Sequence, residues 1–346
     1  MKKIILTALV AGMVFALSGC GDMESPIVTI NSVEFEEEVP PPDPTDKPIP
    51  TLVPGGETNY ITDRVEKDGM MQSYLTGEWK DENVVKRRSM AVMVPNNSPA
   101  LPQYGISRAS IIYEAPVEGR ITRLMLFVED YDDLEYIGPL RSSRDYFVYF
   151  ALEYDAIYVH FGQATPYVGE MLNSIRVDNI SGAVAGIKRP ATNTFYDEPG
   201  RKAPHQKYLN SERLWKDIEK FGYRTYLRQD YVAKFQFETE STPINFVNAE
   251  NATVIYPGGK TSNRPNGFSS VEARFEYNYR YQYGGEHIDE LTGEQLAYDN
   301  VIFQYCHGEV RDEQDYLAFG CHGDEGMMVR VFTQGKMIPG TWSKMT

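Results

Sequence analysis

The sequence predicts an α+β fold, with a mixed α/β N-terminal domain followed by a mainly antiparallel β C-terminal domain. From residue 86 to 228, short apolar runs typical of buried strands alternate with stretches that begin like capped helices. After residue 228, strand-like runs follow one another at regular spacing, separated by Gly-rich turns. A length of 346 residues fits about two domains. We therefore place the domains at residues 86–228 and 229–346.

Residues 1–19 have the pattern of a bacterial export signal. Lys2 and Lys3 precede an apolar run, residues 4–17, that is too short to span a bilayer comfortably. Leu17-Ser18-Gly19-Cys20 resembles a lipobox, in which the cysteine thiol receives a diacylglycerol before cleavage. Two acyl chains, typically including palmitate, suffice for stable anchoring. We expect Cys20 to begin the mature chain and to hold it in the lipid bilayer, on the extracytoplasmic face of the cell membrane.

Residues 20–85 are expected to form a tether. Glu34 and the run Glu36-Glu37-Glu38 precede a Pro-rich stretch from residue 40 to 54. Like charges repel one another and prolines stiffen the chain, so this segment favours an extended spacer. It also has few apolar residues to bury.

The elements of the first domain follow from its apolar runs and capping residues. Apolar runs at 89–94, 110–115, 121–128 and 156–160 predict strands. Ser142 or Ser143 is expected to cap a helix through residues 146–152. Further helices are expected at 166–172, with Pro166 in the first turn, and from Ser211 to Phe221.

The second domain is predicted to contain strands at 253–256, 301–306, 315–321 and 327–332. Residues 273–281 alternate strictly between aromatic or small residues and charged or polar ones, which predicts one strand with one buried face.

The net charge of the chain limits the kinds of molecule that it is expected to bind. A formal net charge of −15 argues against nonspecific binding of nucleic acid, which requires a basic surface. The same charge makes a local group of arginines informative. No cofactor is predicted, because Gly258-Gly259-Lys260 lacks the glycine spacing of a phosphate-binding loop.

Residues 113–144 concentrate arginines beside Gly and Pro at the predicted ends of strands and helices. Guanidinium groups pair bidentately with carboxylate or phosphate, and hydroxyls and free amides at a helix start also favour anions. We therefore expect a cationic cleft that binds an anionic cell-envelope ligand, such as a wall fragment, a peptide carboxylate or a phosphorylated glycan, or else a partner protein. The expected ligand-binding residues are Glu114, Glu118, Arg123, Arg141, Ser142, Arg144, His160, Lys202 and His205.

Several of these motifs, in this order, resemble the YerB-like lipoprotein family. They are residues 113–123, 137–144, 152–156 and 201–205, together with the lipobox. The resemblance implies a two-domain exported lipoprotein whose halves are both domains of unknown function. Arg120 departs from the pattern, since the family commonly has a second glycine there.

Two other interpretations of the same residues stay open. Glu114 and Glu118 could instead pair with the arginines in a buried network that stabilises the domain. A cell-wall hydrolase would use Glu114 and Glu118 as paired carboxylates, or His160 or His205 as general base. Carboxylates four positions apart in an extended segment lie roughly 13 Å apart, which is more than such a pair usually spans.

Cys306-His307 and Cys321-His322 are alike, but they favour a disulfide over a metal site. A two-residue turn at Glu313-Gln314 would place Cys306 opposite Cys321 in a hairpin. A metal site would need each histidine to face the same way as its neighbouring cysteine, and adjacent strand residues face opposite ways. In an exported chain we expect the two cysteines to form a disulfide.

Overall fold

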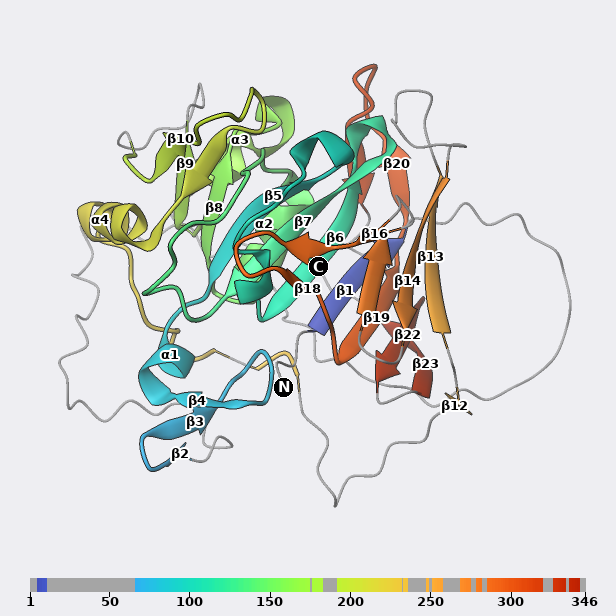
Figure 1. Cartoon of the computed structure of the whole chain (residues 1–346), viewed down its shortest axis with the longest axis horizontal. Helices are drawn as coiled ribbons and strands as arrows, with labels where there is room; N and C mark the ends of the chain where they lie inside the picture. Colours follow the sequence, from blue (N-terminus) through green and yellow to red (C-terminus); the bar gives the residue numbers. More distant parts are fainter. Residues whose placement is uncertain are drawn as a thin grey trace, which may run out of the picture.

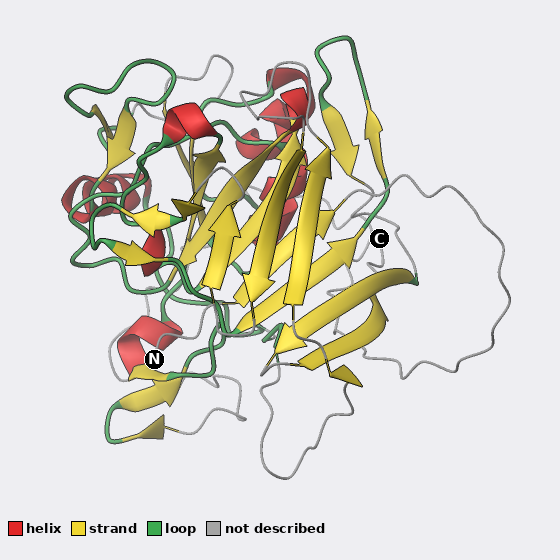
Figure 2. Ribbon diagram, turned by 45° about the vertical axis from the view of Figure 1, so that its right-hand side comes forward, coloured by secondary structure: helices red, strands yellow, loops and turns green. Residues whose placement is uncertain are grey.

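The computed structural model describes residues 5–10, 66–174, 176–182, 192–231, 233–235, 247–248, 251–257, 268–274, 278–281, 285–319, 326–333 and 336–342. A mixed sheet runs through the middle of the molecule, with helices packed beside it (Figure 1, Figure 2). The order of its strands in space is β12–β23–β22–β19–β1–β6–β7–β5–β8–β9. In chain order they are β1 (Ile5–Val10), β5 (Met90–Asn96), β6 (Ile111–Val117), β7 (Ile121–Val128), β8 (Ile157–Phe161), β9 (Asn179–Gly182), β12 (Val247–Asn248), β19 (Asn300–Tyr305), β22 (Met327–Thr333) and β23 (Lys336–Trp342).

The apolar runs of the first domain form the strands predicted for them. β5 is buried at every position, because helices and loops cover both faces of the sheet. β5 runs parallel to β8, and β8 runs parallel to β9. β7 lies antiparallel between β5 and β6. The C-terminal ends of β5, β6, β8 and β9 therefore lie at one edge of the sheet.

Three helices confirm the predicted helical segments and cover the two faces of this sheet. They are α2 (Asp145–Glu153), α3 (Thr165–Asn173) and α4 (Ser211–Phe221). α2 and α3 pack Phe147 and Val168 into the core on one face, and α4 packs Leu214 into the core on the other. Proline near its start favours α3, while α4 ends at Gly222, whose φ of 67° suits glycine.

The predicted cap of α2 is wrong. Arg144 occupies the N-cap position, and no side chain there bonds to the helix amides. Ser143 Oγ is buried and instead accepts a hydrogen bond from the Tyr158 hydroxyl at 2.9 Å. The chain enters the helix one residue later than the serines predict, because both serines lie in the segment that crosses the end of β8.

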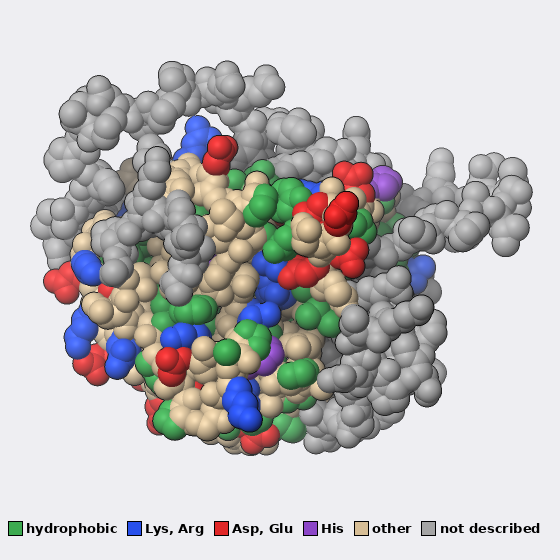
Figure 3. Space-filling view, turned by 90° about the horizontal axis from the view of Figure 1, so that it is seen from above, with side chains coloured by type: hydrophobic (Ala, Val, Ile, Leu, Met, Phe, Trp, Pro, Cys, Tyr) green, Lys and Arg blue, Asp and Glu red, His purple; other side chains and the backbone are tan. Residues whose placement is uncertain are grey.

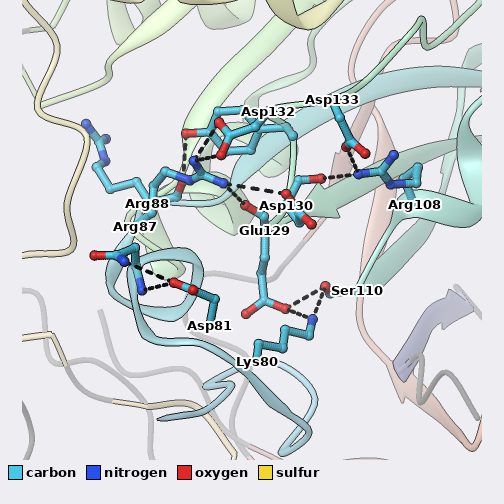
Figure 4. A network of polar contacts seen from close by, with 12 residues as sticks. Lys80, Asp81, Arg87, Arg88, Arg108, Ser110, Glu129, Asp130, Asp132 and Asp133 are labelled. Atoms are coloured by element: carbon cyan, nitrogen blue, oxygen red, sulfur yellow. Dashed lines mark hydrogen bonds and ion pairs between the residues drawn. The ribbon is translucent and has the colours of Figure 1, made fainter. Parts of the chain in front are cut away.

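Residues 66–86 fold against the first domain, although the sequence places most of them in the tether. They form β2 (Glu66–Lys67), β3 (Met70–Gln72), β4 (Trp79–Asp81) and α1 (Glu82–Lys86). A polar network attaches this unit to the large sheet (Figure 4). In it, the buried carboxylate of Glu129 accepts hydrogen bonds from Lys80 Nζ, Ser73 Oγ and Ser110 Oγ.

The first domain carries a small added sheet of β10 (Phe195–Asp197) and β11 (Lys207–Leu209). The second domain is mainly antiparallel, as predicted. Besides its strands in the large sheet, it forms β13 (Asn251–Pro257), β14 (Phe268–Arg274), β15 (Asn278–Tyr281), β16 (Gly285–Glu286), β17 (Ile288–Asp289), β18 (Glu294–Gln295), β20 (Gly308–Val310) and β21 (Leu317–Phe319).

The single strand expected over residues 273–281 is wrong. β14 and β15 are separate antiparallel strands, with Arg274 opposite Asn278. The alternation of residue types continues from β14 into β15, so the pattern hides the reversal of the chain.

The strand β1 belongs to the apolar segment that we expect to be the export signal. It lies between β6 and β19, parallel to both, and joins the strands of the two domains into one sheet (Figure 1). Cys20 lies outside the described residues, so lipidation and signal cleavage stay predictions.

Candidate functional site

The candidate site lies at the edge of the sheet where β5, β6 and β8 end and β7 begins. Arg123 lies near the start of strand β7, and Glu118 lies in a short 3-10 helix (Glu118–Arg120) between β6 and β7. Residues 141–144 cross the end of β8 on their way to α2. Backbone hydrogen bonds fix this crossing, from Arg141 N to Met93 O at 2.9 Å and from Phe161 N to Arg141 O at 3.0 Å.

Gly162 permits this crossing to lie close to β8. Its φ is 89°, a conformation that favours glycine, and a Cβ there would lie 2.6 Å from Ser142 Oγ. Its carbonyl accepts a hydrogen bond from Ser143 N at 2.9 Å. A glycine after β8 therefore allows the arginine-bearing segment to pack directly against the strand end.

Arg123 and Arg144 face the same carboxylate, that of Glu118. Arg144 donates from Nε to Glu118 Oε2 at 2.9 Å and from Nη2 to Oε1, so the contact is bidentate. Arg123 Nη2 lies 3.9 Å from Oε1, an ion pair longer than a hydrogen bond. Both arginines also donate to main-chain carbonyls, Arg123 to Ser142 O and Arg144 to Ser143 O. These carbonyls hold the guanidinium groups independently of Glu118.

Positive charge exceeds negative charge in this cluster. Burial, followed by the charges of Arg144 and Arg141, lowers the pKa of Arg123 to about 9. Burial and the charge of Arg144 also lower the pKa of Arg141. Burial acts to raise the pKa of Glu118, but the hydrogen bond and the charges of Arg144 and Arg123 lower it overall. Three guanidinium groups therefore act on one carboxylate.

Arg141 differs from Arg123 and Arg144 in that its guanidinium group has no hydrogen-bond or ion-pair partner among the described residues. The side chain of Arg141 is partly exposed. The Nε of Arg123 is also buried without a hydrogen-bond partner among the described residues. The cluster thus presents guanidinium donors that the rest of the described chain does not use.

His205 joins the cluster from the loop that precedes β11. Burial, followed by the charges of Arg141, Arg201 and Arg123, lowers the pKa of His205 to about 4, so its ring is neutral at pH 7. Arg201 donates to the carbonyls of Ala100, Leu101 and Pro102, and it adds a fourth positive charge. Lys202 is exposed, and no described residue contacts its ammonium group. The predicted residues Arg123, Arg141, Arg144, Glu118, Ser142 and His205 are thus brought together.

Glu114 does not lie with these residues. Its Oε1 accepts hydrogen bonds from Asn96 Nδ2 at 2.7 Å and from Thr122 Oγ1. In the register of β6 and β7, Glu114 pairs with Leu124 and therefore shares the face opposite Arg123. Glu114 and Glu118 do not form a pair of facing carboxylates.

His160 is fully buried at the end of β8. Its Nδ1 lies 2.8 Å from the carbonyl oxygen of Gly162, and its ring packs against Tyr158 with a centroid distance of 4.9 Å. Burial lowers the pKa of His160 to about 4, even though the Gly162 carbonyl acts to raise it. The ring supports the end of β8 as a neutral group.

A hairpin from the second domain, β20–β21, reaches the cluster. Tyr316 places its ring 5.2 Å from the guanidinium carbon of Arg144. Arg311 pairs with Asp145 in the first turn of α2 at 2.5 Å. The hairpin rises above the sheet in Figure 1. The predictions did not include Tyr316 or Arg311, since no local pattern shows which loops of one domain reach the other.

Figure 3 views the molecule from above. Basic side chains gather at the centre of this face, with a histidine beside them and acidic side chains at one edge. Within the described part of the chain, no three His, Cys, Asp or Glu side chains converge to hold a metal ion. No described helix is long and apolar enough to cross a membrane.

The hairpin that carries Cys306 has the register that the predicted disulfide requires. Gly308 pairs with Phe319 and Val310 with Leu317, and Asp315 N bonds to Asp312 O around a two-residue turn. Cys306 is buried. Cys321 lies outside the described residues, so the disulfide stays a prediction.

Comparisons with known proteins identify relatives of both domains. Residues 75–224 match the family described as "Protein of unknown function (DUF3048) N-terminal domain", and residues 267–346 match its C-terminal domain. A protein of Bacillus subtilis (strain 168), provisionally named lipoprotein YerB, is 27% identical over 303 residues, which is 85% of this chain and 83% of that protein.

A crystal structure of YerB protein from Bacillus subtilis has the same fold. It superposes with a TM-score of 0.59 at 24% identity, over 80% of this chain and 96% of that one.

Proposed function

This chain belongs to the DUF3048 family, and we propose that it is an extracytoplasmic lipoprotein, anchored through Cys20, that binds an anionic envelope ligand at its arginine cluster. The relative named as a lipoprotein supports the anchoring. The lipobox-like residues 17–20 support it from within this chain. In this proposal the domains at residues 86–228 and 229–346 are held away from the membrane by the acidic, Pro-rich stretch.

The observation that carries the binding proposal is the guanidinium group of Arg141, which has no hydrogen-bond or ion-pair partner among the described residues and lies beside two arginines that share one carboxylate. A cluster built only for stability would match its charges, since an unpaired buried charge is costly. Here the pKa of Arg123 is lowered to about 9 by burial and by like charge, so the folded chain is destabilised by its own cations. An anion bound at Arg141 and Arg123 would relieve that repulsion.

The arrangement of the residues does not favour the hydrolase alternative. Glu114 lies on the other face of the sheet from Arg123, and His160 is buried as a neutral ring. Neither faces Glu118. Of the two histidines considered as a general base, only His205 lies in the cluster, where burial and the charges of Arg141, Arg201 and Arg123 lower its pKa to about 4.

The test is a thermal-shift titration of the purified full-length protein against anionic wall fragments and phosphorylated glycans. The Arg141→Gln variant is compared with Arg213→Gln, which removes the same charge from the exposed face of α4. We expect a ligand-dependent rise in Tm for the wild type and for Arg213→Gln, and no rise for Arg141→Gln. Equal rises in all three proteins would refute the assignment of the site.

A further inference from the structure

The charge balance of the cluster specifies what kind of anion it accepts. Arg123, Arg141 and Arg144 together carry three positive charges, Arg201 adds a fourth from the neighbouring loop, and Glu118 supplies one negative charge. A ligand carboxylate that displaces Glu118 only replaces this one negative charge and leaves the surplus unchanged. A phosphate ester adds about two, and three oxygens that accept from guanidinium forks. Neutralising the cluster therefore favours a phosphoryl group over a carboxylate.

Glu118 occupies the position that such an anion would take. Its two oxygens fill the fork of Arg144 but leave Arg123 Nη2 at 3.9 Å, and Arg141 has no hydrogen-bond or ion-pair partner in the described part of the chain. A carboxylate is planar and small, so it satisfies one fork at a time. A tetrahedral phosphoryl group offers oxygens in several directions, and it can accept from more than one of these arginines.

Glu118 can leave this position while the arginines stay in place. It lies in the turn between β6 and β7, and its side chain is 29% exposed. Gly119 follows it with a φ of 72° and with open space where a Cβ would be. The arginines, in contrast, are held by the carbonyls of Ser142 and Ser143.

We propose that Glu118 is an internal substitute for a phosphoryl group, displaced from the Arg144 fork when a phosphate ester or diphosphate binds to Arg123, Arg141 and Arg144. The proposal rests on the function proposed above and names its ligand class. It makes the carboxylate of Glu118 a competitor for the site and gives the β6–β7 turn a part in binding.

The experiment is calorimetric titration of the full-length protein with inorganic diphosphate, inorganic phosphate and citrate at constant ionic strength. The wild type is compared with Glu118→Gln, Glu118→Asp and Arg141→Gln. We expect diphosphate to bind the wild type and to bind Glu118→Gln about tenfold more tightly, because a competing charge is gone. Glu118→Asp shortens the side chain, should also bind more tightly, and serves if the glutamine variant does not fold. Arg141→Gln should lose binding.

The outcomes separate the two proposals. If diphosphate binds the wild type but Glu118→Gln and Glu118→Asp bind it no more tightly, the displacement of Glu118 is wrong and the proposed function stands. If citrate binds, Arg141→Gln abolishes that binding, and neither phosphate nor diphosphate binds, the phosphoryl class is wrong and the proposed function again stands. If no anion binds, and none of the envelope ligands shifts the Tm, both proposals fail.

Discussion

Replacing Arg141 and Arg144 separately by glutamine should change stability in opposite directions. Arg144 is 6% exposed and forms the bidentate contact with Glu118. Removing one partner of a buried ion pair costs roughly 3–5 kcal/mol. Because the Glu118 side chain is 29% exposed, we expect about 2–3 kcal/mol for Arg144→Gln. At about 2–4 °C per kcal/mol for a domain of this size, Tm should fall by roughly 4–12 °C.

Arg141→Gln removes a charge that has no hydrogen-bond or ion-pair partner among the described residues, and whose repulsion by Arg144 outweighs its attraction to Glu118. Coulomb's law gives about 2 kcal/mol for two unit charges some 8 Å apart at an effective dielectric constant of about 20. Solvent screening at the partly exposed Arg141 reduces this, so we expect stabilisation of up to about 1 kcal/mol. Tm should stay level or rise by roughly 2–4 °C.

Differential scanning calorimetry at pH 7 without added phosphate measures both changes, with Arg213→Gln as the control for loss of one positive charge. The decisive comparison is the sign of the difference between the two variants. If Arg141→Gln lowers Tm as much as Arg144→Gln does, then Arg141 stabilises the domain through contacts, and the assignment of surplus charge to a ligand is refuted.

Three further predictions concern other parts of the chain. Burial lowers the pKa of His160 and of His287 to about 4, so the unfolded chain binds more protons than the folded chain between about pH 6.5 and 4. The free energy of unfolding should therefore fall by about 3 kcal/mol per histidine as the pH is lowered to 4. Urea titrations across this range should show a smaller loss for His160→Asn than for the wild type. Gly162→Ala should lower the free energy of unfolding by about 1–3 kcal/mol, because its φ of 89° and the contact with Ser142 both exclude a Cβ, which chemical denaturation would measure. If Cys306 and Cys321 are bonded, intact mass after alkylation in denaturant without reductant should show neither labelled, and reduction should lower Tm. Labelling of both thiols would contradict the pairing.

The sequence allowed the strands and helices around the site to be predicted because each depends on local signals. β7 coincides with the apolar run at 121–128, and Leu124 packs on the face expected from the alternation of side chains along a strand. α4 begins after Asn210, whose side chain accepts from Arg213 N, and ends at Gly222. The β20–β21 register follows from its two-residue turn. Such signals lie within a few residues of the element that they determine.

The positions of the two glutamates could not be predicted in this way. Residues four positions apart in an extended strand face the same side, so the sequence puts Glu114 and Glu118 on one face. β6 ends at Val117, however, and Gly119 adopts a left-handed conformation in the turn. The chain therefore leaves the strand before Glu118, whose side chain turns to Arg144 while Glu114 stays in the core of the opposite face. The end of the strand one residue before Glu118 was enough to separate two residues that the pattern had paired.

The two interpretations that the sequence left open, an internal network and a ligand site, apply to different arginines. Arg144 has a carboxylate and a carbonyl as partners, which suits a structural role. Among the described residues Arg141 has neither, and its pKa is lowered by burial and by the charge of Arg144. Holding Arg144 and Arg123 with carbonyls positions the donors before a ligand arrives, and it limits the ordering that binding would otherwise cost. The paired arginines thus keep the unpaired one available, and for that reason charge removal at Arg141, more than at Arg144, tests for a ligand.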